Sequence, residues 1–339
     1  MRNILIVLVI VVAATASTDV EKWTNFKINN NKVYKNIEEH NHRFEIFKKN
    51  LIRIKEQNEK YEKGESTFKF GITQFADLTE EEFLSRFKSD GNSKLTEIKR
   101  ILSSSKSKSK ISDGADDFPE QYNWVQTGAV TPIRDVLYCG DCVAESVVAA
   151  VEGAEFIKTG NLIQRSSQQV EDCAPFDSDD TLIGLEVVLN YTRDVGLMTE
   201  KDYPWQFDSQ DCQIDNITPT TPLIQITDWI AVSEGNEVEL ERTVYLEGPV
   251  VVAIDTSVNF MLYVDGVLDD PLCENTKNDL DTTLLLVGYG ESKEQGQYWI
   301  LKNYYGTLWG NDGYLWLRRN KNNQCGIATS AVLPVLGFL

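Results

Sequence analysis

The segment from Cys142 to Lys158 constrains the fold of this chain more than any other. Its small and apolar residues recur at spacings of three and four, which predicts a helix with one buried face: Ala144, Val147, Val148, Val151 and Ala154. Cys142 stands at the expected start of this helix. The helix dipole and the free amide groups of a first turn favour a thiolate, so the sequence places a cysteine where a thiol nucleophile is well supported.

The N-terminal residues 1–16 have the organisation of a secretory signal peptide. Arg2 precedes an apolar run over residues 4–12, and Ala14 and Ala16 form a cleavage-type site. The run is too short for a membrane span, and no later stretch supplies one. We therefore expect no membrane association and a secreted, lysosomal or gut-lumen type of compartment, in which disulfides persist.

Charge divides the chain into two unequal parts. Residues 18–113 carry 20 Lys and Arg against 16 Asp and Glu, a net of +4, whereas residues 114–339 carry 12 against 36, a net of −24. The acidic part repels nucleic acid, so we expect no nucleic-acid partner, and it should attract the basic part. Residues 89–113 are rich in serine and lysine, which predicts a disordered linker that is either a processing region or a plain solvated connection.

Residues 17–88 contain the pattern of a helical prosegment. Six of them stand at spacings of three and four on one stripe of a helix: Glu39, Arg43, Phe47, Asn50, Ile54 and Asn58. A second motif spans residues 71–77, and Thr79 is expected to cap a short helix with an acidic first turn. Together these motifs resemble the inhibitory propeptide of cathepsin L-like peptidases of the papain family.

Residues 114–339 resemble the peptidase domain of the same family. The apolar runs 250–254 and 283–287 also predict strands. The resemblance implies an α+β, papain-like two-lobed fold, with a helical lobe and a β-barrel-like lobe, whose cleft holds the chain's own propeptide. We expect a monomer without a cofactor. The motifs that carry the resemblance fall at residues 123–146, 166–173, 202–204, 248–255, 287–290, 298–303, 309–314 and 325–328.

The resemblance assigns four positions of the catalytic site, and two of them are changed. Cys142 falls on the nucleophile, and Asn303 falls on the asparagine that orients the catalytic histidine. Thr282 stands where the family has this histidine, and Val136 stands where it has the glutamine of the oxyanion hole. A papain-type mechanism needs the imidazole to take the thiol proton, so the change at Thr282 removes the base.

Nothing outside the prosegment replaces this base. The chain has two histidines, His40 and His42, and we expect both to be solvated on the prosegment helix. Asp141 and Glu145 flank Cys142, and their carboxylates should oppose a thiolate. We therefore predict a catalytically inactive homologue, a pseudopeptidase.

Two alternatives stay open at this point. One is a cysteine endopeptidase that retains residual activity through Cys142 alone. The other is a binding or inhibitory protein that acts through its propeptide on active papain-like peptidases or on peptide ligands.

The six cysteines limit the possible disulfides. Family positions imply Cys173–Cys212 and Cys273–Cys325, which leaves Cys139 and Cys142 either unpaired or joined to each other. Their Cys-Gly-Asp-Cys spacing is that of a redox motif, but a buried free thiol beside a relic nucleophile is an equally open interpretation. Two sulfurs without a nearby histidine do not indicate a metal site.

Two further features concern the surface of the body. Asn216 begins a glycosylation sequon in an expected loop, and Asn190 begins a second on an expected helix, which favours modification of Asn216. Residues 178–184 lack the cysteine and paired glycines that the family has in the helical lobe, so we expect altered substrate docking there.

Overall fold

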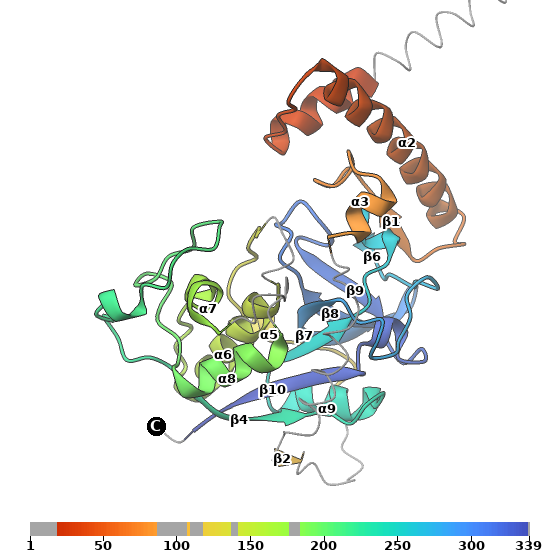
Figure 1. The fold of residues 1–339 in the computed structure, drawn as a ribbon. Helices are drawn as coiled ribbons and strands as arrows, with labels where there is room; N and C mark the ends of the chain where they lie inside the picture. Colours follow the sequence, from red (N-terminus) through yellow and green to blue (C-terminus); the bar gives the residue numbers. More distant parts are fainter. Residues whose placement is uncertain (1–18, 87–106, 109–117, 137–141, 176–183, 338–339) are drawn as a thin grey trace, which may run out of the picture.

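The computed structural model describes residues 19–86, 107–108, 118–136, 142–175 and 184–337 (Figure 1). The expected signal peptide and most of the expected linker over 89–113 lie outside these ranges. So do Cys139, Asp141 and residues 178–183. No helix in the described ranges has both the length and the apolar content for crossing a membrane.

The prosegment is built from helices and one short strand. A first helix covers residues 19–29, and α2 (Ile37–Glu62) follows it. Next come β1 (Phe68–Phe70) and α3 (Glu80–Leu84). The Thr79 hydroxyl accepts a hydrogen bond from the Glu82 N–H, and the Thr79 N–H donates to the Glu82 carboxylate. The expected cap is therefore a full capping box.

The stripe of residues on α2 holds residues 70–78 of the prosegment, which run back along the helix. The Asn50 amide donates to the carbonyls of Ala76 and Leu78 at 2.9 and 3.0 Å. The Asn58 amide donates to the Phe70 carbonyl at 2.9 Å and accepts from its N–H. The amide side chains of the stripe thus satisfy backbone groups of Phe70, Ala76 and Leu78 and hold this segment against the helix.

The body places its helices mainly in one lobe and its strands in the other (Figure 1). Its helices are α5 (Trp124–Thr127), α6 (Cys142–Thr159), α7 (Ser167–Cys173), α8 (Leu185–Asp194) and α9 (Glu237–Leu246). Short 3-10 turns are η2 (Ile214–Asn216), η3 (Val258–Met261) and η4 (Gln324–Gly326).

The strands form one large sheet, whose edge strand β2 lies in the expected linker, and one small sheet shared by the prosegment and the body. The large sheet has the order β2-β4-β10-β5-β7-β8-β9, with β3 paired to β7, and β1 of the prosegment pairs with β6. The remaining bounds are β2 (Ser107–Lys108), β3 (Tyr122–Asn123), β4 (Ile226–Ala231), β5 (Val250–Ile254), β6 (Tyr263–Gly266), β7 (Thr282–Ser292), β8 (Gly296–Lys302), β9 (Tyr314–Arg318) and β10 (Ser330–Leu336). The apolar runs expected to be strands are β5 and part of β7.

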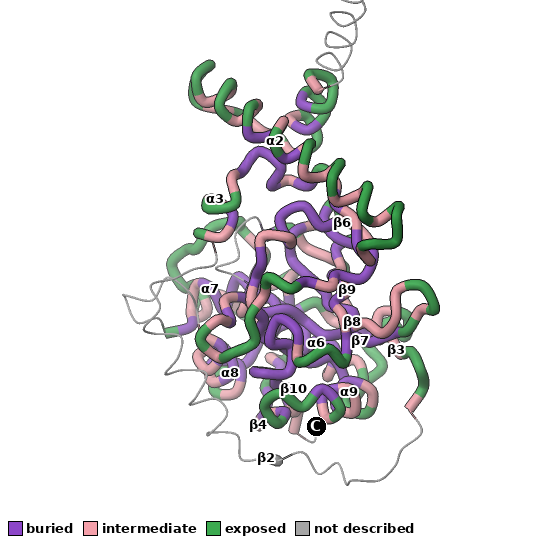
Figure 2. The backbone as a smooth tube through the Cα atoms, turned by 90° about the vertical axis from the view of Figure 1, so that its right-hand side faces the viewer, coloured by how far each residue is buried: buried purple, intermediate pink, exposed green. Residues whose placement is uncertain are grey.

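Helix α6 is the buried axis around which the helical lobe packs. Its residues Ala144, Val147 and Val151 are fully buried, and they belong to the same apolar cluster as Val251 of β5 and Leu285 of β7. Figure 2 shows that burial is concentrated on α6 and the central strands, whereas the outer side of α2 is exposed. The prediction of one buried face is too narrow, because residues 144–153 are all buried, whereas Ala154 is only partly buried.

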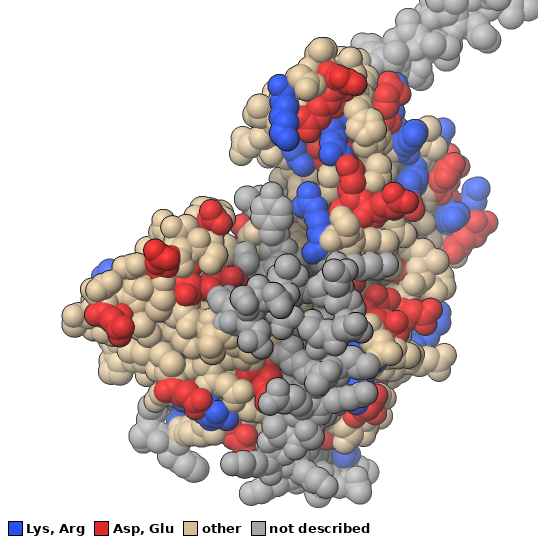
Figure 3. Space-filling model, in the orientation of Figure 1, with Lys and Arg blue, Asp and Glu red and all other residues tan. Residues whose placement is uncertain are grey.

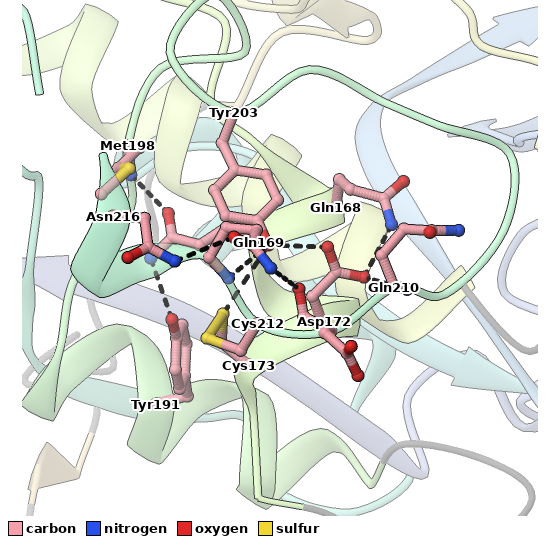
Figure 4. The surroundings of a disulfide bond; sticks show 12 residues. Gln168, Gln169, Asp172, Cys173, Tyr191, Met198, Tyr203, Gln210, Cys212 and Asn216 are labelled. Atoms are coloured by element: carbon pink, nitrogen blue, oxygen red, sulfur yellow. Dashed lines mark hydrogen bonds between the residues drawn. A yellow bond between two sulfur atoms is a disulfide. The ribbon is translucent and has the colours of Figure 1, made fainter. Parts of the chain in front are cut away.

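Two disulfides close loops of the body. Cys173 is joined to Cys212 with Cα atoms 4.8 Å apart, and Cys273 is joined to Cys325 with Cα atoms 4.9 Å apart. Beside the first bridge, the Tyr203 hydroxyl donates to the Asp172 carboxylate at 2.7 Å (Figure 4). This bond and the bridge together hold the 203–213 loop on α7.

Candidate functional site

The start of α6 is tied to the start of β7 through hydroxyl groups. The carbonyl of Cys142 accepts from Ser146 Oγ at 2.7 Å and from Thr283 Oγ1 at 3.1 Å. The two hydroxyls are also 3.1 Å from each other. Cys142 is fully buried, and Thr282, the residue before Thr283 on β7, is 6% exposed. Successive side chains of a strand point to opposite faces, so the hydroxyl of Thr283, rather than that of Thr282, faces the start of α6.

Asn303 and Val136 meet in the same region through Tyr304. The Val136 N–H donates to the Tyr304 carbonyl at 3.1 Å, and the Asn303 side-chain oxygen accepts from the Tyr304 N–H at 2.8 Å. Burial raises the pKa of Tyr304 well above its ordinary value, and the hydroxyl of Ser146 faces it. Val136, Cys142 and Tyr304 share one apolar cluster.

The amide nitrogen of Asn303 has no hydrogen-bond partner among the described residues. Asn303 is 1% exposed. An imidazole that an asparagine orients donates its N–H to the side-chain oxygen, and here that oxygen accepts from the Tyr304 N–H instead.

Cys142 is joined in a disulfide, and no described cysteine is a free thiol. The other four described cysteines are paired with one another. The partner of Cys142 therefore lies outside the described residues. A sulfur held in a disulfide has no lone thiolate with which to attack a carbonyl.

Glu145 is neutralised by an ion pair, which corrects the expectation that its charge opposes a thiolate. The Arg134 guanidinium lies 3.2 Å from the Glu145 carboxylate and 2.9 Å from Glu200, and the Ser167 hydroxyl donates to Glu145 at 2.5 Å. Burial opposes the charge on Arg134, but both carboxylates hold its pKa above the ordinary value. Glu200 is 66 residues from Arg134, so no local pattern could have revealed this partner.

The prosegment docks on the body chiefly through backbone atoms. Strand β1 pairs antiparallel with β6. The hydroxyl of Thr67 donates to the Val267 carbonyl, and that of Thr73 to the Met261 carbonyl, both at 2.5 Å. One charged pair, Lys69 with Asp265 at 3.1 Å, lies beside the ladder. The docked segment thus forms a separate two-stranded sheet with β6 of the body.

Residues 71–78 of the prosegment then run back along α2 and contact Tyr305, the residue after Tyr304. Gln74 donates to the Tyr305 carbonyl at 2.5 Å, and the Phe75 ring meets the Tyr305 ring edge-on with centroids 5.2 Å apart. A pocket of about 680 Å³ is lined from both sides here, by Gln74 and Arg86 of the prosegment and by Asp135 and Tyr305 of the body. The prosegment is therefore a ligand of the body beside the candidate site.

Comparison with known proteins identifies the family. Residues 118–335 match the family described as papain family cysteine protease, which is more than half of the chain. This chain belongs to the papain family. Residues 23–83 match the cathepsin propeptide inhibitor domain (I29), so both halves of the papain-family proform are present.

The papain-family relatives match over nearly the whole chain. Cathepsin L of Sarcophaga peregrina is 33% identical over 347 residues, which cover 99% of this chain and 100% of the relative. Digestive cysteine proteinase 1 of Homarus americanus is 36% identical over 320 residues, 93% of this chain and 94% of the relative. The solved digestive procathepsin L 3 of Tenebrio molitor larval midgut has a TM-score of 0.81 at 32% identity, covering 94% of this chain and 99% of that one.

These matches confirm a cathepsin L-like proform homologue with the papain-like fold. One expectation about the prosegment is wrong: His40 is not simply solvated, because its ring meets the rings of Trp23 and Tyr34 edge-on. His42 is exposed, as expected. Asn216 lies exposed in η2, and Asn190 lies on α8. Trp23 is 17 residues from His40, beyond the reach of a helical repeat, so sequence periodicity could not reveal the contact.

Proposed function

We propose that this papain-family proform has a body without peptidase activity. The observation that carries the proposal is the place of the two histidines, His40 and His42, both of which lie on α2 of the prosegment. Acyl transfer to cysteine needs a base that takes the thiol proton and later protonates the leaving amine. Thr282, which we assign to the position of that base, carries a hydroxyl that does not accept a proton at neutral pH.

Three observations support this proposal. The Cys142 sulfur is engaged in a disulfide, and we propose Cys139 as its partner. The Asn303 side-chain oxygen, the atom that would accept from an imidazole N–H, accepts from the Tyr304 N–H at 2.8 Å. Val136 offers no side-chain donor to an oxyanion, and one such donor is worth roughly 3 kcal/mol. Together, the missing base and donor should lower turnover by several orders of magnitude.

The test compares the natural chain with variants in which the missing groups are restored. Thr282→His and Val136→Gln would be combined, with and without Cys139→Ala to free the Cys142 sulfur. Each protein would be processed, and turnover of a fluorogenic peptide and labelling by a thiol-directed electrophile would be measured. We expect no turnover by the natural chain and measurable turnover by the restored triple variant.

Cys142→Ser in each background is the matched control, because it separates true activity from a contaminating peptidase. Turnover by the natural chain that disappears with Cys142→Ser would show that the body is a residual cysteine endopeptidase. Turnover that persists with Cys142→Ser comes from another protein and is discounted.

We propose a second role for the prosegment, as an inhibitor of active papain-like peptidases. The observation that favours it is the nature of the docking contacts, since Thr67, Thr73 and Gln74 all donate to backbone carbonyls of the body. Backbone atoms occupy the same places in every protein of one fold, so a related body offers the same acceptors. The charges agree, because Figure 3 shows Lys and Arg interspersed with Asp and Glu over the prosegment, whereas Asp and Glu predominate on this face of the body.

An active cathepsin L-like peptidase would be titrated with the chain after cleavage of its linker. We expect inhibition at micromolar concentration or below, a binding free energy of about −8 kcal/mol or stronger. Phe75→Ala is the matched control, because it removes the ring that meets Tyr305. Absence of inhibition at micromolar concentration would leave the prosegment as a ligand of its own body only.

The digestive relatives of lobster and beetle midgut support a secreted or gut-lumen compartment for this chain. We propose that it acts there as a processed or unprocessed proform, where an acidic body remains soluble.

A further inference from the structure

The large sheet of the body continues beyond β4 into a short strand of the linker. Strand β2 runs parallel to β4, with Ser107 opposite Ile230 and Lys108 opposite Ala231. Figures 1 and 2 show β2 at the end of the molecule away from the prosegment helices. This contact is therefore separate from the docking of the prosegment on β6 and Tyr305.

The register of β4 against β10 decides which backbone groups of β4 face outward. In an antiparallel pair, opposite residues alternate between those that exchange hydrogen bonds and those that exchange none. The Val232 N–H donates to the Ala331 carbonyl at 3.0 Å, and Trp229 lies opposite Pro334, which has no N–H to donate. Trp229 and Ala231 therefore belong to the alternate set, and their N–H and C=O groups point away from β10.

Strand β4 closes part of this outer edge by itself. The Trp229 N–H donates to the Asp228 carboxylate at 2.9 Å, so the edge needs no acceptor from another strand at that position. The outward groups that follow are the Trp229 carbonyl and the Ala231 N–H, which flank Ile230. Ser107 lies opposite Ile230, so its N–H faces this carbonyl and its carbonyl faces this N–H.

The composition of the linker suits an outer edge. An uncovered strand edge pairs readily with other chains, and natural proteins cover or charge such edges, often with lysine. Residues 103–110 consist only of serine and lysine, and the acidic body attracts them. Because these residues bring no apolar side chain to bury, backbone bonds must hold the strand, and the short tether to Phe118 keeps its local concentration high.

We propose that the outer edge of β4 is a docking site for the chain's own linker, which adds a parallel strand centred on Ser107. This strand attaches the linker to the body independently of the prosegment helices. A cut after Lys110 leaves the docked strand on the prosegment, which is then held at two places. A cut before Ser103 leaves the strand on the body, and the prosegment keeps one attachment. The proposal does not depend on whether the body is active.

Hydrogen–deuterium exchange of the full chain tests the docked strand. The exchange rate of the Ala231 amide would be measured in the natural chain and in Ser107→Pro, which removes the N–H that faces Trp229. We expect this amide to exchange about three to ten times faster in Ser107→Pro, because the bonds along the edge are lost. Ser103→Pro, the same change four residues earlier, is the matched control and should leave the rate unchanged.

Two further measurements exclude other causes of a slow Ala231 amide. Replacement of Lys106, Lys108 and Lys110 by serine keeps the backbone and removes the charges, and the amide should stay protected. Loss of protection in this variant would show a purely electrostatic contact and overturn the proposal. Equal rates in the natural chain and Ser107→Pro would also overturn it. Protection that grows with protein concentration would assign the edge to a second copy of the chain instead of the linker.

The two-point attachment has a test of its own. Two chains would each carry one engineered cleavage site, placed either before Ser103 or after Lys110. After cutting, the prosegment should leave the body several times more slowly when the docked strand stays with it. Ser107→Pro should remove this difference. Equal dissociation rates in the two cut chains would show that the strand does not help to retain the prosegment.

Discussion

Lys302 and Glu152 share the hydroxyl of Thr131 beneath the candidate site. The Lys302 ammonium donates to Thr131 Oγ1 at 2.9 Å, and this hydroxyl donates to the Glu152 carboxylate at 2.6 Å. Both charged groups are buried. Burial lowers the pKa of Lys302 and raises that of Glu152, so each charge depends on the other. Lys302 directly precedes Asn303, so this buried charge pair adjoins the candidate site.

Removing one charge of this pair should destabilise the body strongly. We expect Lys302→Met or Glu152→Gln to lower the free energy of unfolding by about 3–5 kcal/mol, because the remaining charge is buried without its partner. The double variant should recover much of this loss. Urea unfolding measures both. Lys55→Met, in an exposed pair on α2, is the control and should cost less than about 1 kcal/mol. Equal losses in the two single variants and the control would contradict the assigned coupling.

Acid should weaken the prosegment through Glu82. Burial opposes the Glu82 charge, but hydrogen bonds from Arg43 and Thr79 hold the pKa of Glu82 below its ordinary value of 4.5. This contribution to stability is present above that value and is lost as the pH falls through the lowered pKa. Glu82→Gln should lower the melting temperature at pH 6 and flatten the decline below pH 4.5. Glu81→Gln, on the exposed side of α3, should retain the decline.

Phe75 should supply much of the docking energy of the prosegment. Its buried ring packs against Phe83 and Tyr305, so Phe75→Ala should cost about 3–5 kcal/mol. After cleavage of the linker, we expect the variant prosegment to separate from the body in size-exclusion chromatography, whereas the natural prosegment co-elutes. Ile72→Ala, at a more exposed neighbouring position, should co-elute. Separation of both variants would mean that cleavage, rather than the lost ring, releases the segment.

Alkaline pH should destabilise the body through Tyr203. Burial and the hydrogen bond to Asp172 raise the pKa of Tyr203 to about 12. Because this pKa exceeds the ordinary value of about 10, the contribution is present below pH 10 and is lost as the pH rises towards 12, at about 1.4 kcal/mol per pH unit. Tyr203→Phe should be less stable by about 1 kcal/mol at pH 8 and should show a shallower alkaline decline. An unchanged decline would assign it to other tyrosines.

Thiol chemistry should find no reactive cysteine in the folded or denatured oxidised chain. Cys142 is in a disulfide, so we expect an alkylating reagent to modify it only after reduction. Non-reducing peptide mapping should then yield Cys142 linked to Cys139, together with the Cys173–Cys212 and Cys273–Cys325 pairs. A Cys142 peptide that is alkylated without reductant would contradict the disulfide and show that Cys142 is a free thiol.

The sequence determined the parts of this protein that depend on neighbours along the chain. The repeat in α6 predicted the helix and four of its buried residues, Ala144, Val147, Val148 and Val151, because residues three and four apart share one side of a helix. The apolar runs marked β5 and β7, and Thr79 marked the start of α3, because a cap needs only the next turn. The absence of a histidine from the body is likewise a property of the sequence alone.

Tertiary structure decided which groups become partners across the chain. Thr131 meets Lys302 at a separation of 171 residues, and Arg134 neutralises Glu145 together with Glu200. His40 was expected on the surface, but its ring packs against Trp23 and accepts a hydrogen bond from the Trp23 indole. Periodicity describes which face a side chain occupies, but it carries no information about what the folded chain places opposite that face. Those pairings arise only when packing brings distant elements together, and there burial makes each charge and donor depend on its partner.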